Sequence, residues 1–169
     1  MEDMDFETVL RRHADCITRL CLVNTGNQED AKDCCQNVFL KLYLSDKKFS
    51  NEEHLKAWLI RIAINECRDF HRTLWKRKVD LGYQGVTEEK LSGKQIINGE
   101  EQVIYKEECR ELLAALQRLP ERYREVLYLY YYESFHTGEI AEMLNLRVNT
   151  VKSRLLRGRK KLAERMGER

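Results

Sequence analysis

Apolar residues recur three and four positions apart along most of this chain, which is the spacing of one buried face of an α-helix. Three such stretches cover residues 5–24, 29–44 and 55 to about 76. Their apolar stripes consist of Phe6, Val9, Leu10, His13, Ile17, Leu20 and Cys21; Ala31, Cys34, Cys35, Val38, Phe39 and Leu42; and Leu55, Leu59, Ile62, Ala63, Cys67, Phe70 and Leu74. Three amphipathic helices of this length predict a small bundle around one core.

The helical period is lost from Val79 to about Gly99, where glycines and scattered charges predict a flexible linker. It resumes over residues 100–118, with Val103, Ile104, Leu112, Leu113 and Leu116 apolar. The only proline, Pro120, marks a helix break and a new start, because proline is tolerated at a first helical position. That next helix runs to about Glu133, with Tyr123, Val126, Leu127, Tyr130 and Tyr131 expected to face inward.

The final amphipathic stretch, residues 137–162, is typical of two helices joined by a tight turn. Ile140, Ala141 and Leu144 share one face, followed by the stripe Val148, Val151, Leu155, Gly158 and Leu162. Asn149, Thr150, Ser153, Arg157 and Lys160 point outward, with further lysines and arginines on the flanks. A short helix before a basic helix that starts with small polar residues favours a DNA-binding helix-turn-helix over an ordinary solvated face.

Composition supports an all-α protein, because the chain has one proline and 8 glycines in 169 residues. The predicted linker divides it into two small helical domains. The predicted units are residues 1–78, a linker over 79–99, and residues 100–169. No apolar run is long enough to span a membrane, and the acidic N-terminus lacks a signal pattern. The sequence therefore predicts a cytoplasmic protein.

The formal net charge of +2 conceals alternating blocks. Residues 1–53 carry a net −4, residues 54–78 a net +5, residues 79–146 a net −6 and residues 147–169 a net +7. Two basic segments predict two contacts with a polyanion. In the first, Trp58, His71 and Trp75 lie among arginines and lysines, a mixture that suits single-stranded nucleic acid. Trp58 itself is interpreted as a core tryptophan in preference to a base-stacking one.

Six cysteines raise the question of a metal site. None of them forms a C-x-x-C pair, and Cys34 and Cys35 are adjacent, so we expect reduced thiols that pack as small hydrophobes and no metal. His13, in the first apolar stripe, is interpreted as a core or boundary histidine. No phosphate loop or nucleophile–base pattern occurs, so the sequence predicts neither an enzyme nor a cofactor.

The segment LPERYREVLYLYYYESFHTGEIAEMLNLRVNTVKSRLLRGRKKL resembles region 4 of the extracytoplasmic-function (ECF) sigma factors of the sigma-70 family. EDAKDCCQNVFLKLY followed by FSNEEHLKAWLIRIAINECRDFHR resembles their region 2. The order and the linker length match as well. The resemblance implies two domains, a region-2 bundle and a four-helix region 4, which bind core RNA polymerase, direct it to a promoter and open the −10 duplex.

The resemblance also implies roles for particular residues. Contact with the clamp of the largest polymerase subunit falls to Asp33, Gln36 and Asn37. The residues implied to bind the −10 element and its flipped base are Phe49, Trp58, Arg61, Asn65, Arg68 and Arg72. The residues implied to bind the −35 element are Arg147, Asn149, Thr150, Lys152, Ser153, Arg154 and Arg157. Further partners implied are the flap of the second-largest subunit and an anti-sigma factor.

The chain departs from the family pattern at three places. Asn37 stands where relatives usually carry an acid, and Arg147 stands where they carry a capping serine. Thr137 is expected to cap the first helix of the helix-turn-helix in place of His136. Two other interpretations stay open: a helix-turn-helix regulator that is not a sigma factor, and a redox or metal sensor built on the cysteines.

Overall fold

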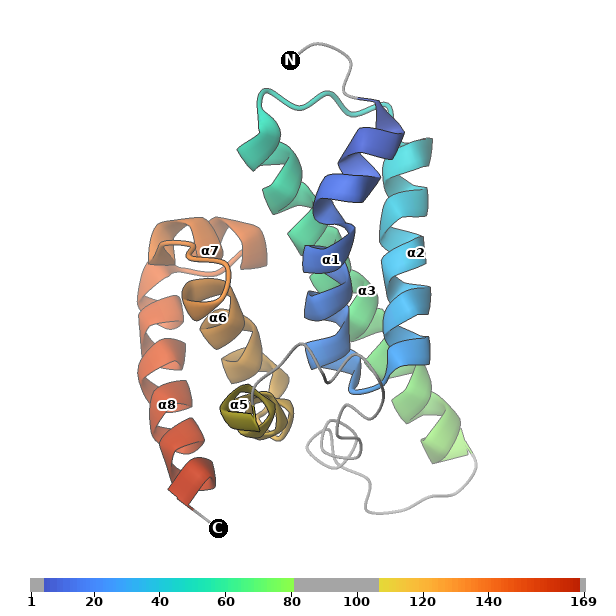
Figure 1. Ribbon diagram of the computed structural model, residues 1–169. Helices are drawn as coiled ribbons and strands as arrows, with labels where there is room; N and C mark the ends of the chain where they lie inside the picture. Colours follow the sequence, from blue (N-terminus) through green and yellow to red (C-terminus); the bar gives the residue numbers. More distant parts are fainter. Residues whose placement is uncertain (1–4, 81–106, 168–169) are drawn as a thin grey trace.

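The computed structural model describes residues 5–80 and 107–167, and within these ranges every regular element is an α-helix. Three helices form one bundle and four form a second, and the two bundles lie side by side (Figure 1). The predicted all-α, two-domain fold is therefore confirmed. The first two positions of the predicted linker belong to the third helix, and the rest of the linker lies outside the described residues. Val103 and Ile104 lie outside the described residues as well.

The first bundle consists of α1 (Phe6–Thr25), α2 (Gln28–Leu44) and α3 (Glu52–Asp80). Gly26 ends α1 in the left-handed conformation, with φ of 85°, and its N–H donates to the Leu22 carbonyl. Asn27 then caps α2, because its side chain accepts a hydrogen bond of 2.9 Å from the Asp30 N–H. The tight turn between α1 and α2 is thus built from a C-terminal cap and an N-terminal cap.

The core of this bundle follows most of the predicted stripes. Leu10 lies at the surface with 36% of its area exposed. Five further stripe residues are half-buried at the margin of the core: Phe6, Leu42, Ile62, Phe70 and Leu74. Ile60 and Ile64, outside the predicted stripe, are almost fully buried. The reason is that α3 contacts α1, α2 and also α7 of the second bundle, so a wider arc of its surface is covered than one stripe provides.

The second bundle consists of α5 (Glu107–Gln117), α6 (Glu121–Tyr131), α7 (Thr137–Leu144) and α8 (Val148–Gly167). Its core contains Leu113, Leu116, Leu119, Val126, Leu127, Leu129, Ile140, Val151 and Leu155. Gly158 lies against α6 as the stripe predicted, since a Cβ there would be 3.1 Å from Leu127 Cδ1. Glycine therefore allows α8 to approach α6 closely.

Three expectations for this bundle are wrong. Tyr131 is 57% exposed rather than inward, while Tyr128 is 1% exposed. Val148 is 40% exposed, because the α8 stripe becomes buried only from Val151 onward. Thr137 is the first residue of α7 and not its cap: the chain enters through His136, whose backbone N–H donates to Glu139 Oε2 at 2.8 Å.

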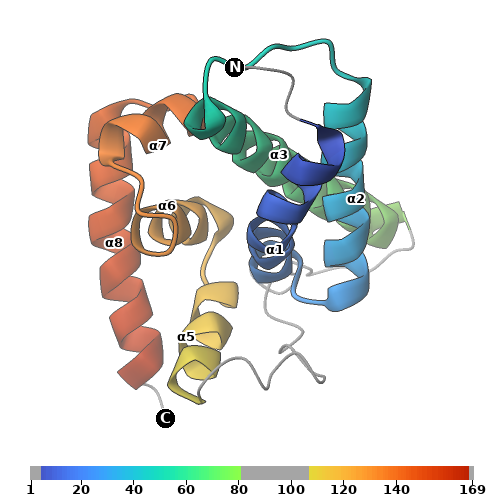
Figure 2. The same ribbon diagram turned by 45° about the horizontal axis from the view of Figure 1, so that its top comes forward.

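The two bundles meet along α1 and α3 on one side and α5, α6 and α7 on the other (Figure 2). Charged residues of α6 line this contact, with Arg124 and Glu125 each only 1% exposed. Cys21, Cys34, Cys35 and Cys67 are buried free thiols, as expected, and Cys16 is half-buried at the contact. No helix in the described part of the chain has the length and apolar character needed to cross a membrane.

Candidate nucleic-acid interface

The first candidate surface is the N-terminal half of α8 together with the turn before it. Asn145 closes α7 in the left-handed conformation, with φ of 54°, and the Leu146 N–H donates to the Ala141 carbonyl at 2.8 Å. This turn sets α8 across α7. Because Val151, Leu155 and Gly158 fix one side of α8 in the core, the opposite side must face solvent.

The predicted −35 residues lie on that outer side. Arg147, Asn149, Lys152, Ser153 and Arg157 are exposed, whereas Thr150 and Arg154 are half-buried. Leu156 lies beside them with 68% of its area exposed. The structure therefore brings six of the seven residues together on α8 and places Arg147 in the turn directly before it, with Thr150 and Arg154 at the margin of the exposed face.

The electrostatics of this face favour an anion. The first turn of α8 contains no acidic residue, so the positive end of the helix dipole is not compensated there. Among the ion pairs of the described residues, none involves a lysine or arginine of α8. Such a face is suited to DNA phosphates and base edges.

The second candidate surface begins in the loop before α3. The ring of Phe49 meets His54 at 5.4 Å and Trp58 at 5.5 Å between centroids, in edge-on geometry. The ammonium of Lys47 lies 6.0 Å from the Phe49 ring centre. Phe49 and Trp58 are both half-buried against the core of the first bundle. Trp58 therefore packs partly in the core, and the rest of its ring remains accessible to nucleic acid. An aromatic corner with a cation at its rim can stack a base.

The remaining residues of this surface follow one another along α3. Arg61, Asn65, Arg68 and Arg72 are spaced three or four positions apart and so share one side of the helix. Arg61 and Asn65 are exposed, and the Arg72 side chain is 76% exposed, 3.4 Å from Asp69. Arg68 differs, because its guanidinium reaches across to α6 and pairs with Glu125. Three of the four side chains are thus available to a strand, and Arg68 is engaged within the chain.

The predicted polymerase-binding residues lie on α2. Asp33, Gln36 and Asn37 are all exposed on its outer side. Beside Gln36 runs an apolar groove between α1 and α2, lined by Phe6, Leu10, Phe39, Leu40 and Tyr43. Leu40 and Tyr43 are 54% and 68% exposed. Sequence reasoning missed this groove, although apolar residues lying off the α2 stripe were a readable signal.

A second apolar pocket, with a volume of about 390 Å³, lies between α5, α6 and α8. It is lined mainly by Leu112, Leu116, Leu127, Tyr131, Tyr132, Leu162 and Met166. Arg159 closes its edge by donating to the Tyr131 hydroxyl at 2.6 Å. The sequence placed Tyr131 in the core. The structure shows that Tyr131 instead lines this open pocket, which leaves the side chain exposed.

Comparison with known proteins is consistent with this geometry. Residues 9–77 match the family description "Sigma-70 region 2", and residues 109–162 match "Sigma-70, region 4". The ECF RNA polymerase sigma factor SigW of Bacillus subtilis is 30% identical, over 95% of this chain and 88% of that protein. RNA polymerase sigma factor SigV of the same organism is 33% identical, over 90% of this chain and 86% of that protein.

Solved structures give the same picture of the fold. The sigma factor RpoE in complex with the anti-sigma factor NepR from Bartonella quintana has a TM-score of 0.76 at 22% identity, covering 96% of this chain and 97% of that chain. CnrH in complex with the cytosolic domain of CnrY has a TM-score of 0.65 at 22% identity, covering 94% of this chain and 85% of that chain.

Proposed function

The chain belongs to the ECF group of the sigma-70 family, and we propose that its two exposed basic surfaces divide promoter recognition between them. It is an RNA polymerase sigma factor, a non-enzymatic subunit for promoter recognition and transcription initiation. We assign residues 1–78 to polymerase binding and the −10 element, and residues 100–169 to the −35 element. The observation that carries this division is that α3 and α8, in different bundles, each present a basic surface.

The outer side of α8 is assigned to the −35 element in the major groove. Asn149 and Ser153 are short polar side chains near the helix start, where base edges come within reach. Arg147, Lys152 and Arg157 flank them and suit phosphates. Thr150 and Arg154 lie at the margin, so their assigned contacts are made from the edge of this face.

The Phe49–Trp58 corner and α3 are assigned to the −10 element. A base flipped out of the duplex loses a few kcal/mol of stacking, which an aromatic corner and adjacent cations can offset. Asn65 supplies both a donor and an acceptor for a base edge. Arg61 and Arg72 are assigned to the phosphates of the separated single strand. Arg68 binds the same strand when it is not paired with Glu125.

Polymerase contacts are assigned to two surfaces of opposite character. Asp33, Gln36 and Asn37 offer polar groups to the clamp of the largest subunit, and the groove next to them adds apolar area. The pocket between α5, α6 and α8 is suited to an apolar segment and is assigned to the flap of the second-largest subunit. We place the protein in the cytoplasm with its polymerase.

An anti-sigma factor is proposed as a further partner. The support is that two structural neighbours, RpoE and CnrH, were solved as complexes, with NepR and with the cytosolic domain of CnrY respectively. A pull-down of the tagged chain from its native host tests this, because polymerase subunits and an inhibitor should be recovered together.

The decisive experiment is transcription in vitro with purified core polymerase and a promoter selected from host DNA. Addition of this chain should produce a defined transcript, which is lost when either the −35 or the −10 element is scrambled. Binding to duplex DNA without initiation at any selected promoter would instead identify a helix-turn-helix regulator. A defined transcript that survives removal of the −35 element would overturn the assignment of α8.

A further inference from the structure

We propose that an ion-pair latch between α3 and α6 holds the two bundles together and withholds Arg68 from DNA. This inference rests on the proposed function only for the role of Arg68 in strand binding. The latch itself is a property of contacts within the chain. Its centre is the pair formed by Arg68 of the first bundle and Glu125 of the second.

The central pair is bidentate. Arg68 Nε donates to Glu125 Oε1 at 3.0 Å, and Arg68 Nη2 donates to Glu125 Oε2 at 2.6 Å. The Glu125 side chain is 1% exposed and that of Arg68 is 31% exposed. Glu121, one turn earlier on α6, lies 3.6 Å from Arg68 Nε. A parallel fork on a buried carboxylate has far better geometry than an ordinary surface ion pair.

A second contact surrounds Asn24 at the end of α1. Arg124 Nε donates to Asn24 Oδ1 at 2.9 Å, and Arg124 Nη1 donates to the Leu119 carbonyl at 3.1 Å. The Asn24 carbonyl is 2.6 Å from His71 Nε2 of α3. Asn24 therefore joins α1, α3 and α6 at one point, and Arg124, at 1% exposure, is kept buried by these partners.

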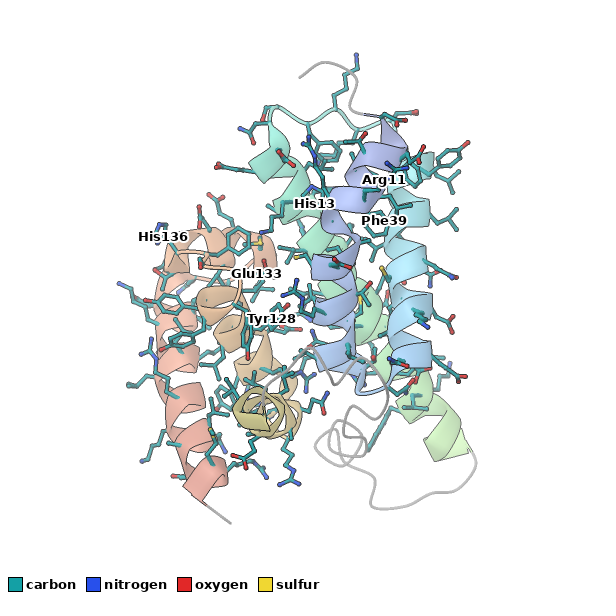
Figure 3. The ribbon with its side chains drawn as sticks, in the orientation of Figure 1. Arg11, His13, Phe39, Tyr128, Glu133 and His136 are labelled. Atoms are coloured by element: carbon teal, nitrogen blue, oxygen red, sulfur yellow. The ribbon has the colours of Figure 1, made fainter. Side chains whose placement is uncertain are left out.

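A third contact is made by Glu133, just after α6. Figure 3 shows Tyr128 and Glu133 on the side of the second bundle that faces α1. Glu133 accepts hydrogen bonds from Cys16 Sγ at 3.2 Å and from the Tyr128 hydroxyl at 3.3 Å, and it lies 3.1 Å from Lys56 Nζ. Burial and then the Glu133 charge raise the pKa of Cys16 to about 12, so the thiol remains a donor.

The polar character of these contacts makes the closed form reversible. Removing two charges from water costs about as much free energy as their mutual attraction contributes. Such an interface therefore fixes how the two bundles are aligned more than it adds to the net stability of the closed form. When the bundles separate, Glu125 and Arg68 regain water, and DNA phosphates can take the place of the Glu125 carboxylate. Closure and strand binding therefore compete for the same guanidinium.

The test measures closure and DNA binding separately, on the full chain without polymerase. Small-angle X-ray scattering of the native chain should give a radius of gyration of about 15 Å, the value typical of a compact chain of this length. Glu125→Gln should shift it to larger values. In anisotropy titrations with a short fluorescent single-stranded DNA of mixed sequence, the same variant should bind about three- to tenfold more tightly, because more molecules have Arg68 available.

Glu164→Gln is the matched control, since it removes the same charge from an exposed position on α8. The charge-swapped double variant Arg68→Glu with Glu125→Arg should restore the compact scattering curve. Arg68→Gln, judged by scattering alone, should open the chain as Glu125→Gln does, so a poorly folded Glu125 variant leaves the proposal testable.

A Glu125→Gln chain as compact as the Glu164→Gln control, with unchanged DNA affinity, would overturn the latch. So would a charge swap that stays open. Neither result bears on initiation with core polymerase, and failure of initiation does not alter the scattering curves, so the two proposals fail separately.

Discussion

The basic sides of α3 and α8 differ in what holds them before any DNA is bound. In the described part of the chain, no α8 lysine or arginine is in an ion pair, whereas Lys56, Arg68 and Arg72 of α3 each lie near a carboxylate. Two of those carboxylates, Glu125 and Glu133, belong to the other bundle. With the roles proposed above, the difference implies that α8 is ready to read a duplex, while part of α3 becomes available only when the bundles move apart.

The cause lies in how much of each helix is buried. The buried stripe of α8 is narrow, consisting of Val151, Leu155 and Gly158. On α3 the buried arc is wider, because Ile60, Ile64 and His71 are covered as well. A helix covered by three neighbours has fewer side chains left for DNA, and those near the second bundle acquire partners there.

The largest effect should come from filling the space that makes α8 fit. Gly158→Leu places a side chain where even a Cβ would lie 3.1 Å from Leu127 Cδ1 and 3.3 Å from Tyr123 Cβ. We expect a loss of about 3 kcal/mol in the stability of the second bundle, the upper part of the range for overpacking. Duplex DNA binding should be lost with it.

Two tryptophans make this result specific to one bundle. Trp58 and Trp75 both lie on α3, so tryptophan fluorescence during urea unfolding follows the first bundle, and far-ultraviolet circular dichroism follows both. Gly138→Leu is the control, because a Cβ there meets nothing within 4 Å. Equal effects of the two glycine substitutions, or an equal loss of the tryptophan transition, would contradict this account of α8.

The next effect separates base contacts from phosphate contacts on α8. Asn149→Ala should change which −35 sequences are preferred, at about 1–3 kcal/mol per lost base contact. Arg157→Ala should weaken binding to all sequences alike and reduce the salt dependence by about one ion. Selection from a randomised −35 duplex, followed by salt titrations, measures both quantities.

The control for this pair is Arg11→Ala, which removes an exposed arginine that pairs with Glu7 on α1, far along the chain from α8. It should leave the sequence preference and the salt slope unchanged. If the Asn149 and Arg157 variants behave alike, the division between reading and anchoring residues is wrong, and α8 binds by charge alone.

The sequence was informative where one periodic stripe decides burial. Gly158 was placed correctly from spacing, because α8 has a single buried side. Spacing failed for Ile62, Ile64 and Tyr131, whose burial depends on contacts with elements distant in sequence. Periodicity shows that a helix has one buried side. It does not show whether a second neighbouring helix covers a different side of the same helix.

The candidate sites show the same limit. Residues near each other on one helix, such as Arg61, Asn65 and Arg72, could be grouped from their numbers. The pairing of Arg68 with Glu125 could not, because 57 positions separate them. Nor could the sequence show that the exposed Leu40 and Tyr43 border one groove with Phe6 of α1, since helix packing alone creates it.

A smaller effect tests the α3 surface where it is exposed. Asn65→Ala should change the preferred −10 base by about 1 kcal/mol or slightly more, the low end for one base contact. Association with core polymerase should be unchanged, because Asn65 is on α3 and the assigned clamp contacts are on α2. Thr73→Ala, two turns further along α3 and also exposed, is the control. Equal transcription from all −10 variants by the Asn65→Ala protein and the native protein would remove Asn65 from the base pocket.

The smallest effect is a dependence on pH that should appear in the first bundle. Burial lowers the pKa of His13 below its usual value of 6.5, and Lys56 and Arg12 add to this, while Glu52 opposes it. His13 Nε2 makes no hydrogen bond and lies 3.6 Å from the Glu52 carboxylate. The unfolded chain therefore binds a proton as the pH falls through about 6.5, whereas the folded chain does so only at lower pH.

Stability is consequently present in full above pH 6.5 and should fall as the pH drops below that value, with a slope of at most about 1.4 kcal/mol per pH unit for one proton. His13→Leu removes the proton-binding group and keeps the position apolar, so its tryptophan-monitored urea midpoint should change less between pH 7 and pH 5.5 than that of the native chain. Val9→Ala, one turn earlier in the same buried stripe, should lower the midpoint at both pH values by the same amount, since it removes packing and no titrating group. If the His13→Leu chain keeps the native slope, the acid sensitivity arises elsewhere, and the carboxylates that join α3 to the second bundle become the groups to titrate next.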